Sequence, residues 1–196
     1  SFFDVYNCPD DEVTEVWVDA EEGTEVDFSY GVGDLCSITE DVWVSPEGDN
    51  DNLGTSEAEA FLTIRRAIEM IAPEDDDPIT INLTGGTVND PDIFAPSTSG
   101  ETFPIIMISN VNLIGKSYVY SFIDAETNNT VIDMSYSSNN IISDLRISGG
   151  LFGMEIVHSS DIKLKDLKIQ NNCLGIYSHN TSAVLDNIRI QNNGTL

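Results

Sequence analysis

Two acidic residues, Asp144 and Asp166, occupy equivalent positions in a segment that this 196-residue chain repeats about every 22 residues. If the copies stack as adjacent strands, the two carboxylates lie about 5 Å apart, close to the separation found in retaining glycosidases. They are therefore candidate catalytic residues, and two stacked carboxylates could equally hold a calcium ion. The alternative is a ladder of surface charge, which is worth little energetically.

Three basic residues recur at the same spacing. Arg146, Lys168 and Arg189 follow the acidic positions of successive copies, on the face that carries the acids. One interpretation is that they neutralise these acids on a solvated face. The other is that they line a groove for an acidic sugar, which makes them candidate ligand-binding residues.

An acidic loop offers a second candidate metal site. Asp49 and Asp51 could bind calcium there, because calcium prefers oxygen ligands. The spacing does not fit the EF-hand loop, since the fifth and twelfth positions counted from Asp49 are Leu53 and Ala60. A turn-rich loop without an ion is the alternative, so calcium is a candidate cofactor that the sequence leaves open.

The charge of the chain is strongly unbalanced, with 34 acidic and 8 basic residues and a net charge of −26. Within residues 1–100 the only bases are Arg65 and Arg66. Such an N-terminal half repels phosphates and anionic lipids, so we expect no nucleic-acid partner. No apolar run approaches the roughly 18 residues of a membrane span, so we expect no membrane insertion. An acidic surface that keeps a secreted protein dispersed is the simplest interpretation.

Cysteines and glycosylation sequons bear on localisation. No C-x-x-C pair occurs, which argues against zinc and thioredoxin-like sites. Cys8 and Cys36 could form one disulfide, as in an exported protein, with Cys173 left over; free thiols are the alternative. We therefore expect an extracellular or cell-surface location. Four sequons are candidate glycan sites in a eukaryotic secreted protein: Asn82, Asn128, Asn180 and Asn193.

The repeat also predicts the elements that position these residues. Ile142, Leu164 and Leu185 form one of several apolar columns, and a fixed period with like residues aligned is the signature of a solenoid. One coil of about 22 residues suits three short strands and three turns, so we predict an all-β parallel β-helix over 42–196. One amphipathic α-helix is expected over about 61–72. Residues 1–41 are predicted to form a small acidic β extension.

Two stretches carry a resemblance to known proteins. The first is Val-Ser-Pro-Glu-Gly-Asp-Asn-Asp-Asn-Leu-Gly-Thr-Ser at 44–56 with Phe-Leu-Thr-Ile-Arg-Arg-Ala-Ile at 61–68. The second is Asn-Val-Asn-Leu-Ile-Gly at 110–115 with Ser-Phe-Ile-Asp-Ala at 121–125. Residues 42–196 thereby resemble right-handed parallel β-helix proteins of the pectate-lyase-like (pectin lyase fold) superfamily. The resemblance implies a helix that caps the N-terminal end of the solenoid. It implies no single activity, because the superfamily includes lyases, hydrolases, epimerases, adhesins and non-catalytic proteins.

The sequence favours an exported, non-catalytic β-helix protein that acts as an extracellular structural or surface subunit. About three to four coils can be counted, and an uncovered last coil offers a strand edge for self-association. Head-to-tail association would give a filament. Two alternatives stay open: the N-terminal part of a polysaccharide lyase or glycoside hydrolase, and a carbohydrate-binding module that uses the basic residues. Both alternatives imply a glycan or polysaccharide partner.

Overall fold

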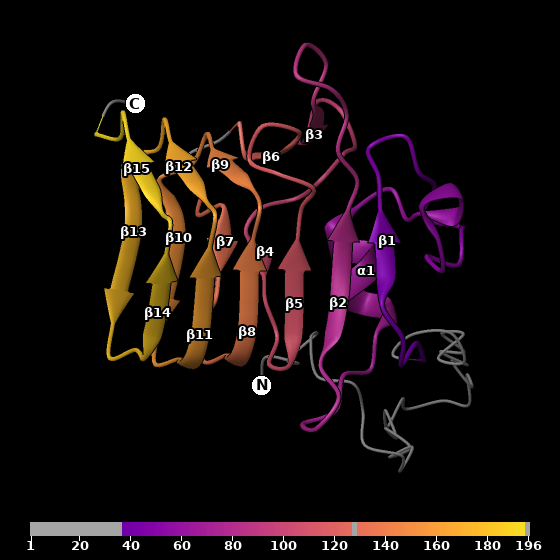
Figure 1. The fold of residues 1–196 in the computed structure, drawn as a ribbon, viewed down its shortest axis with the longest axis horizontal. Coiled ribbons are helices and arrows are strands. Elements are labelled where there is room, and N and C mark those ends of the chain that lie inside the picture. Colours follow the sequence, from indigo (N-terminus) through magenta and orange to yellow (C-terminus); the bar gives the residue numbers. More distant parts are fainter. Residues whose placement is uncertain (1–36, 127–128, 195–196) are drawn as a thin grey trace, which may run out of the picture.

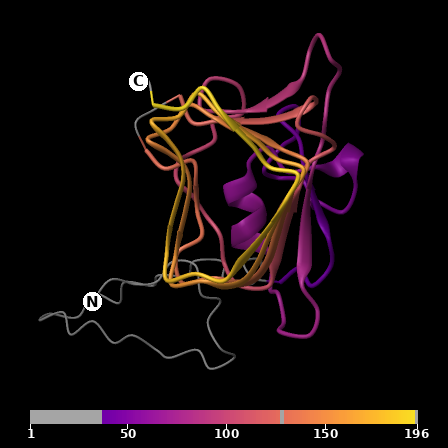
Figure 2. The ribbon, with the colours of Figure 1, turned by 60° about the vertical axis from the view of Figure 1, so that its left-hand side comes forward.

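The computed structural model describes residues 37–126 and 129–194, and its strands form three parallel sheets that wind as coils of a β-helix (Figure 1). The chain passes through the three sheets in turn, and successive coils overlie one another when the stack is viewed obliquely from its C-terminal end (Figure 2). The predicted all-β, right-handed parallel β-helix is confirmed.

All three sheets are parallel throughout and contain strands from successive coils. In order across the six-stranded sheet, the strands are β1 (Val42–Val44), β2 (Ile79–Leu83), β5 (Val111–Ile114), β8 (Ser138–Ser143), β11 (Ser160–Lys165) and β14 (Ala183–Asp186). The five-stranded sheet contains β3 (Asp92–Phe94), β6 (Ser121–Asp124), β9 (Arg146–Ser148), β12 (Lys168–Gln170) and β15 (Arg189–Gln191). The four-stranded sheet contains β4 (Ile105–Ile106), β7 (Ile132–Asp133), β10 (Phe152–Val157) and β13 (Leu174–His179).

Apolar side chains from the three sheets fill the lumen. The predicted column is confirmed by the strand register, because Leu164 pairs with Ile142 on one side and with Leu185 on the other. Ile142 and Leu164 are almost completely buried. Full burial of such a side chain stabilises the fold by roughly 1.5–3 kcal/mol, so the stacked columns are the main source of stability.

A ladder of asparagine side chains runs between the five-stranded and four-stranded sheets. The Oδ1 atom of buried Asn172 accepts a hydrogen bond from the N–H of Gly150, one coil earlier, at 3.0 Å. Asn193 repeats this arrangement one coil later, and its Oδ1 accepts from the N–H of Asn172 at 3.0 Å. Glycines leave room for both amides. A β carbon at Gly153 would lie 2.8 Å from Nδ2 of Asn172, and one at Gly175 would lie 3.1 Å from Nδ2 of Asn193.

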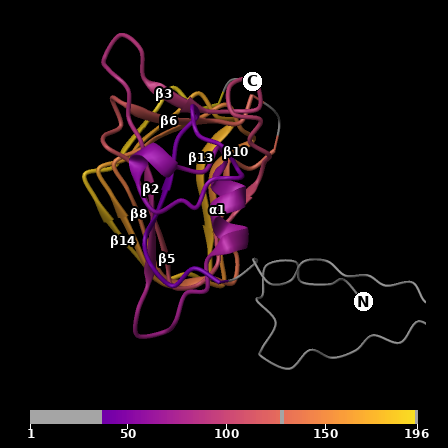
Figure 3. The ribbon, with the colours of Figure 1, turned by 90° about the vertical axis from the view of Figure 1, so that its right-hand side faces the viewer.

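The N-terminal end of the lumen is closed by the helix α1 (Ile64–Met70), which lies across the ring of strands (Figure 3). This confirms the capping helix but not its predicted span of about 61–72. Phe61 instead forms a parallel bridge with Val44, and Ile71 has an extended backbone and bridges Ile38. The residues at both ends of the predicted span therefore form parallel bridges, which join the capping helix to β1 and to the preceding chain.

A buried carboxylate, Glu101, holds the start of this helix. Glu101 is 1% exposed, and it accepts hydrogen bonds from the backbone N–H groups of Ile64 at 2.6 Å and Arg65 at 3.3 Å. Thr63 completes the cap, because its side chain accepts from the N–H of Arg66. Burial raises the pKa of Glu101 above its ordinary value, against the lowering effect of these backbone hydrogen bonds.

Several sequence predictions fall outside the described residues. They are the β extension of 1–41 except for its last residues, the disulfide between Cys8 and Cys36, and the sequon at Asn128. Of the extension, Ile38 is described and lies beside the capping helix through its bridge to Ile71. Within residues 37–126 and 129–194, no helix has the length and apolar character needed to span a membrane.

Candidate functional site

Asp144 and Asp166 lie at the corner between the six-stranded and five-stranded sheets. They occupy successive coils as predicted, because Ser143 and Lys165, which precede them, are paired. They are turn residues rather than strand residues: φ is 60° at Asp144, 50° at Asp166 and 52° at Asn187 in the next coil. Asp and Asn tolerate this left-handed conformation better than most residues, which explains why short acids and amides recur where the chain changes direction.

Both carboxylates are engaged in contacts at this corner. Asp166 accepts a hydrogen bond from Nδ2 of Asn187, and its other oxygen lies 3.5 Å from Nζ of Lys165. The Asn187 hydrogen bond, with a smaller effect of Lys165, lowers the pKa of Asp166. Asp144 accepts from Oγ of Ser143 at 2.8 Å. A general acid needs a raised pKa to keep its proton near neutral pH. These surroundings favour a structural role, and catalysis by the pair remains a prediction.

The candidate binding residues Arg146, Lys168 and Arg189 are in register on β9, β12 and β15, and together they are called the basic column. Phe122 of β6 precedes Arg146 in the same register, and the guanidinium carbon of Arg146 lies 4.3 Å from the centroid of its ring. The guanidinium carbon of Arg189 lies 5.3 Å from the ring centroid of Tyr118. A cation–π contact orients a guanidinium group without using its N–H donors.

In the described part of the chain, no ion pair supports the first interpretation of the sequence, in which the basic column neutralises the acids at the corner. Among the described residues, none of the three bases of the column takes part in an ion pair. The carboxylate of Asp166 pairs with Lys165 instead. The reason is geometric, since the acids lie on the turn whereas the column lies on the strands beyond it. The positive charge of the column therefore stays available to a ligand.

The position of Tyr118 depends on a longer connection between the two sheets. Only Asp144 and Leu145 separate β8 from β9, whereas residues 115–120 separate β5 from β6. This segment places the Tyr118 ring beside Arg189, three coils further along the stack. The repeat alignment does not indicate this contact, because residues 116–120 have no equivalent in the later coils.

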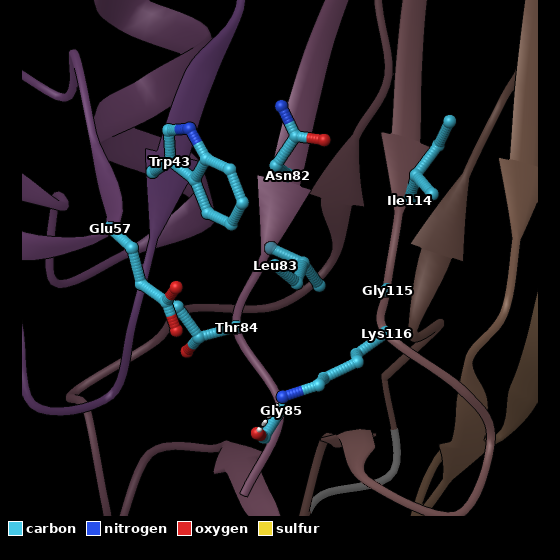
Figure 4. Close-up of a pocket in the computed structure, with 9 residues that line it drawn as sticks. All are labelled: Trp43, Glu57, Asn82, Leu83, Thr84, Gly85, Ile114, Gly115 and Lys116. Carbon is cyan, nitrogen blue, oxygen red and sulfur yellow. Dashed lines mark hydrogen bonds between the residues drawn. The ribbon is translucent and has the colours of Figure 1, made fainter.

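An open pocket of about 200 Å³ lies on the outer face of the six-stranded sheet near its N-terminal end (Figure 4). Trp43 of β1 pairs with Asn82 of β2, so the indole and the amide lie side by side. Glu57 comes from a short 3-10 helix, η1 (Glu57–Glu59), and Lys116 follows β5. The lining residues are Trp43, Glu57, Asn82, Leu83, Thr84, Gly85, Ile114, Gly115 and Lys116.

Comparisons with known proteins agree with this architecture. Residues 106–196 match a family model described as "Rhamnogalacturonase A/epimerase, pectate lyase-like". A crystal structure of a pectin methylesterase mutant in complex with a hexasaccharide has a TM-score of 0.53 and 15% sequence identity, covering 79% of this chain and 50% of that chain. This chain has a parallel β-helix fold, and its residues 106–196 are pectate-lyase-like. It spans half the length of the pectin methylesterase chain, and at 15% identity the likeness concerns the fold alone. A search of the curated proteins finds no match.

The acidic loop that contains Asp49 and Asp51 is stabilised by hydrogen bonds. Oδ1 of Asp49 accepts from the N–H of Asp51 at 3.0 Å. Oδ1 of Asn50 accepts from the N–H groups of Leu62 at 3.0 Å and Thr63 at 3.1 Å, which joins the loop to the start of the capping helix. No group of three or more His, Cys, Asp or Glu residues in the described part of the chain could hold a metal ion. Calcium binding by Asp49 and Asp51 remains a prediction.

The described sequons differ in their surroundings. Asn180 is exposed at a turn with φ of 48°, where its side chain contacts Nδ1 of His158 at 2.7 Å. Asn82 is half-buried in β2 and donates to the carbonyl of Val42. Asn193 belongs to the asparagine ladder and donates to the carbonyl of Ile169. Asn180 is therefore the most accessible of the three in the folded chain.

Proposed function

We propose that this chain is a carbohydrate-binding β-helix module whose basic column binds an acidic polysaccharide. The observation that carries this function is the register of Arg146, Lys168 and Arg189 on three successive coils. Adjacent strands lie about 4.8 Å apart, so the column presents a row of positive charge along the solenoid. An extended polymer with repeated anionic groups can contact several of these bases at once. The similarity to pectate-lyase-like proteins supports a carbohydrate as the ligand.

The arginines are suited to this role by their environment. A guanidinium group presents a planar fork that matches a carboxylate with two N–H donors. Cation–π contacts with the rings of Phe122 and Tyr118 restrict the guanidinium groups of Arg146 and Arg189. This reduces the side-chain entropy lost on binding. Each exposed charge contact is worth about 0.2–1 kcal/mol. Binding should therefore depend on several bases together and should weaken as the salt concentration rises.

This function keeps the non-catalytic interpretation of the sequence and supplies a ligand for it. An extracellular or cell-surface location follows from the proposed ligand and from the acidic, sequon-bearing sequence. Head-to-tail assembly into a filament is a separate prediction. Light scattering over a wide range of protein concentrations tests it, and a constant monomer mass would contradict it.

A contribution to polysaccharide cleavage is the second candidate. It is favoured by the family model, whose description names a rhamnogalacturonase and an epimerase. In that case Asp144 and Asp166 are the residues to test. If a screen of uronic-acid polymers, with and without calcium, shows cleavage that survives Asp144→Asn together with Asp166→Asn, the pair is not catalytic.

Affinity measurements with polygalacturonate and alginate, with neutral dextran as the control polymer, test the preferred function. We expect Arg146→Ala or Arg189→Ala to lower affinity several-fold at low salt, and Lys168→Ala combined with Arg189→Ala to lower it more than tenfold. Lys163→Ala is the matched control, because Lys163 is exposed on the six-stranded sheet and lies outside the basic column. Equal losses in the control and the column variants would show non-specific attraction and refute the assignment.

A further inference from the structure

The pocket on the six-stranded sheet contains an acidic and a basic side chain that form no ion pair with each other in the described structure. Glu57 and Lys116 are both exposed, and their side chains extend toward Thr84 and Gly85 from opposite sides (Figure 4). No ion pair joins Glu57 to Lys116 within the residues that the structure describes. Nζ of Lys116 donates a long hydrogen bond of 3.5 Å to the carbonyl of Gly85. A ligand between the two side chains would thus meet a carboxylate that accepts and an ammonium group that donates.

The rest of the pocket supplies an apolar wall and fixed polar groups. The half-buried indole of Trp43 and the side chain of Ile114 stand on the outer face of the sheet. Between them, the amide of Asn82 is held by its hydrogen bond to the carbonyl of Val42 at 3.3 Å. Gly85 permits the close approach of the Lys116 stem, because a β carbon there would lie 2.7 Å from Cβ of Lys116.

We propose that this pocket binds a single neutral pyranose residue. One face of such a ring carries C–H groups that pack against an indole, while its hydroxyls can donate to Glu57 and accept from Lys116. The charges of Glu57 and Lys116 offset each other, so an anionic sugar gains from Lys116 about what it loses to Glu57, and the pocket gives no net advantage to a charged ring. The volume of about 200 Å³ lies below the roughly 300–1,000 Å³ of pockets for drug-sized ligands, which fits one ring. The pocket is thus a second site, independent of the acidic polymer bound by the basic column.

Titration of the protein, produced without glycans, with methyl glycosides of glucose, galactose, mannose and xylose tests this site. Methyl glucuronide serves as the anionic comparison. The chain has two tryptophans, Trp17 and Trp43, so Trp17→Phe leaves Trp43 as a single fluorescent reporter for the titration. Calorimetry on the unmodified chain provides a readout that does not depend on this substitution.

We expect at least one neutral glycoside to bind and to change the Trp43 fluorescence, with an affinity that Trp43→Ala lowers at least tenfold. Glu57→Gln should weaken neutral binding several-fold and strengthen the binding of methyl glucuronide, because it removes the repulsion while keeping the shape of the side chain. Tyr136→Ala is the aromatic control: Tyr136 is 77% exposed, lies outside the pocket, and its loss should leave binding unchanged.

The assignment is overturned if no neutral glycoside binds at millimolar concentration, or if binding is equal in the parent protein and in Trp43→Ala. Arg146→Ala separates this site from the basic column. Neutral binding that persists in Arg146→Ala supports the pocket whether or not the acidic polymer binds, and neutral binding that is lost there places the ligand on the column instead.

Discussion

Asn172→Ala is expected to destabilise the solenoid far more than the loss of one amide at the surface would. Asn172 is fully buried, and Gly150, whose N–H it accepts, is buried as well. The amide nitrogen of Asn172 donates to the carbonyls of Gln170 at 3.0 Å and Ile147 at 3.3 Å. The substitution therefore leaves the buried N–H of Gly150 without its acceptor. It also removes one hydrogen-bond donor from each of the carbonyls of Gln170 and Ile147 in the interior of the stack.

The magnitude follows from these contacts. Leaving one buried N–H without a partner costs about 1–3 kcal/mol. The weakened carbonyls and the small cavity left by the amide add to this, so we expect a loss of about 2–4 kcal/mol in the free energy of unfolding. A domain of this size has roughly 5–15 kcal/mol of stability in total. The variant should remain folded at low temperature but unfold at a much lower urea concentration.

Urea unfolding followed by circular dichroism measures this loss, with an unchanged dependence on urea showing that the same surface unfolds. Asn193→Ala is the matched control, because Asn193 has the same place in the ladder but is half-exposed. Water can replace its amide, so we expect a loss of about 1 kcal/mol or less. If Asn172→Ala costs no more than Asn193→Ala, burial of the ladder is not what stabilises this corner, and the reasoning fails.

Two further predictions concern Glu101 and the sequons. Because burial raises the pKa of Glu101, its contribution favours folding at acidic pH and is lost as the pH rises through the raised pKa. We therefore expect the difference in free energy of unfolding between the parent protein and Glu101→Gln to fall as the pH is raised through this range. Urea unfolding at a series of pH values measures this difference, and an increase with pH would contradict the prediction. In a glycosylating host, mass spectrometry of peptides should find a glycan at exposed Asn180, which Asn180→Gln abolishes. Modification of half-buried Asn82 alone would contradict the accessibility argument.

The solenoid could be predicted from the sequence because a repeat constrains many contacts at once. Alignment of Ile142 with Leu164 and Leu185 gives the strand register directly, since coils of equal length must stack like residue on like. The same alignment placed the basic column correctly in successive coils. The helix limits were less predictable, because Phe61 and Ile71 continue its apolar pattern but pair with strands and with the preceding chain.

Other parts of the site could not be found from the repeat. The aligned positions of Asp144 and Asp166 show that these residues stack, but not that the backbone turns there with a positive φ. Tyr118 comes from an insertion that has no aligned equivalent, and it contacts Arg189 across several coils. Glu101 reaches the start of a helix 37 residues earlier in the chain. Such contacts depend on the path of individual loops, for which one sequence provides no periodic signal.

Binding at the basic column depends on charge, whereas binding in the pocket depends mainly on apolar packing. The salt dependence of binding therefore distinguishes the two proposed sites. The basic column attracts its ligand through charges at the protein surface, and charges separated by more than about 8 Å are largely screened at physiological ionic strength. The pocket places Trp43 against an uncharged ring, and apolar packing is not screened by salt. Raising the salt concentration should thus abolish the binding of acidic polymers while neutral glycosides still bind. Equal salt sensitivity of the two ligands would contradict this assignment, because a neutral ring packed against Trp43 carries no charge for salt to screen.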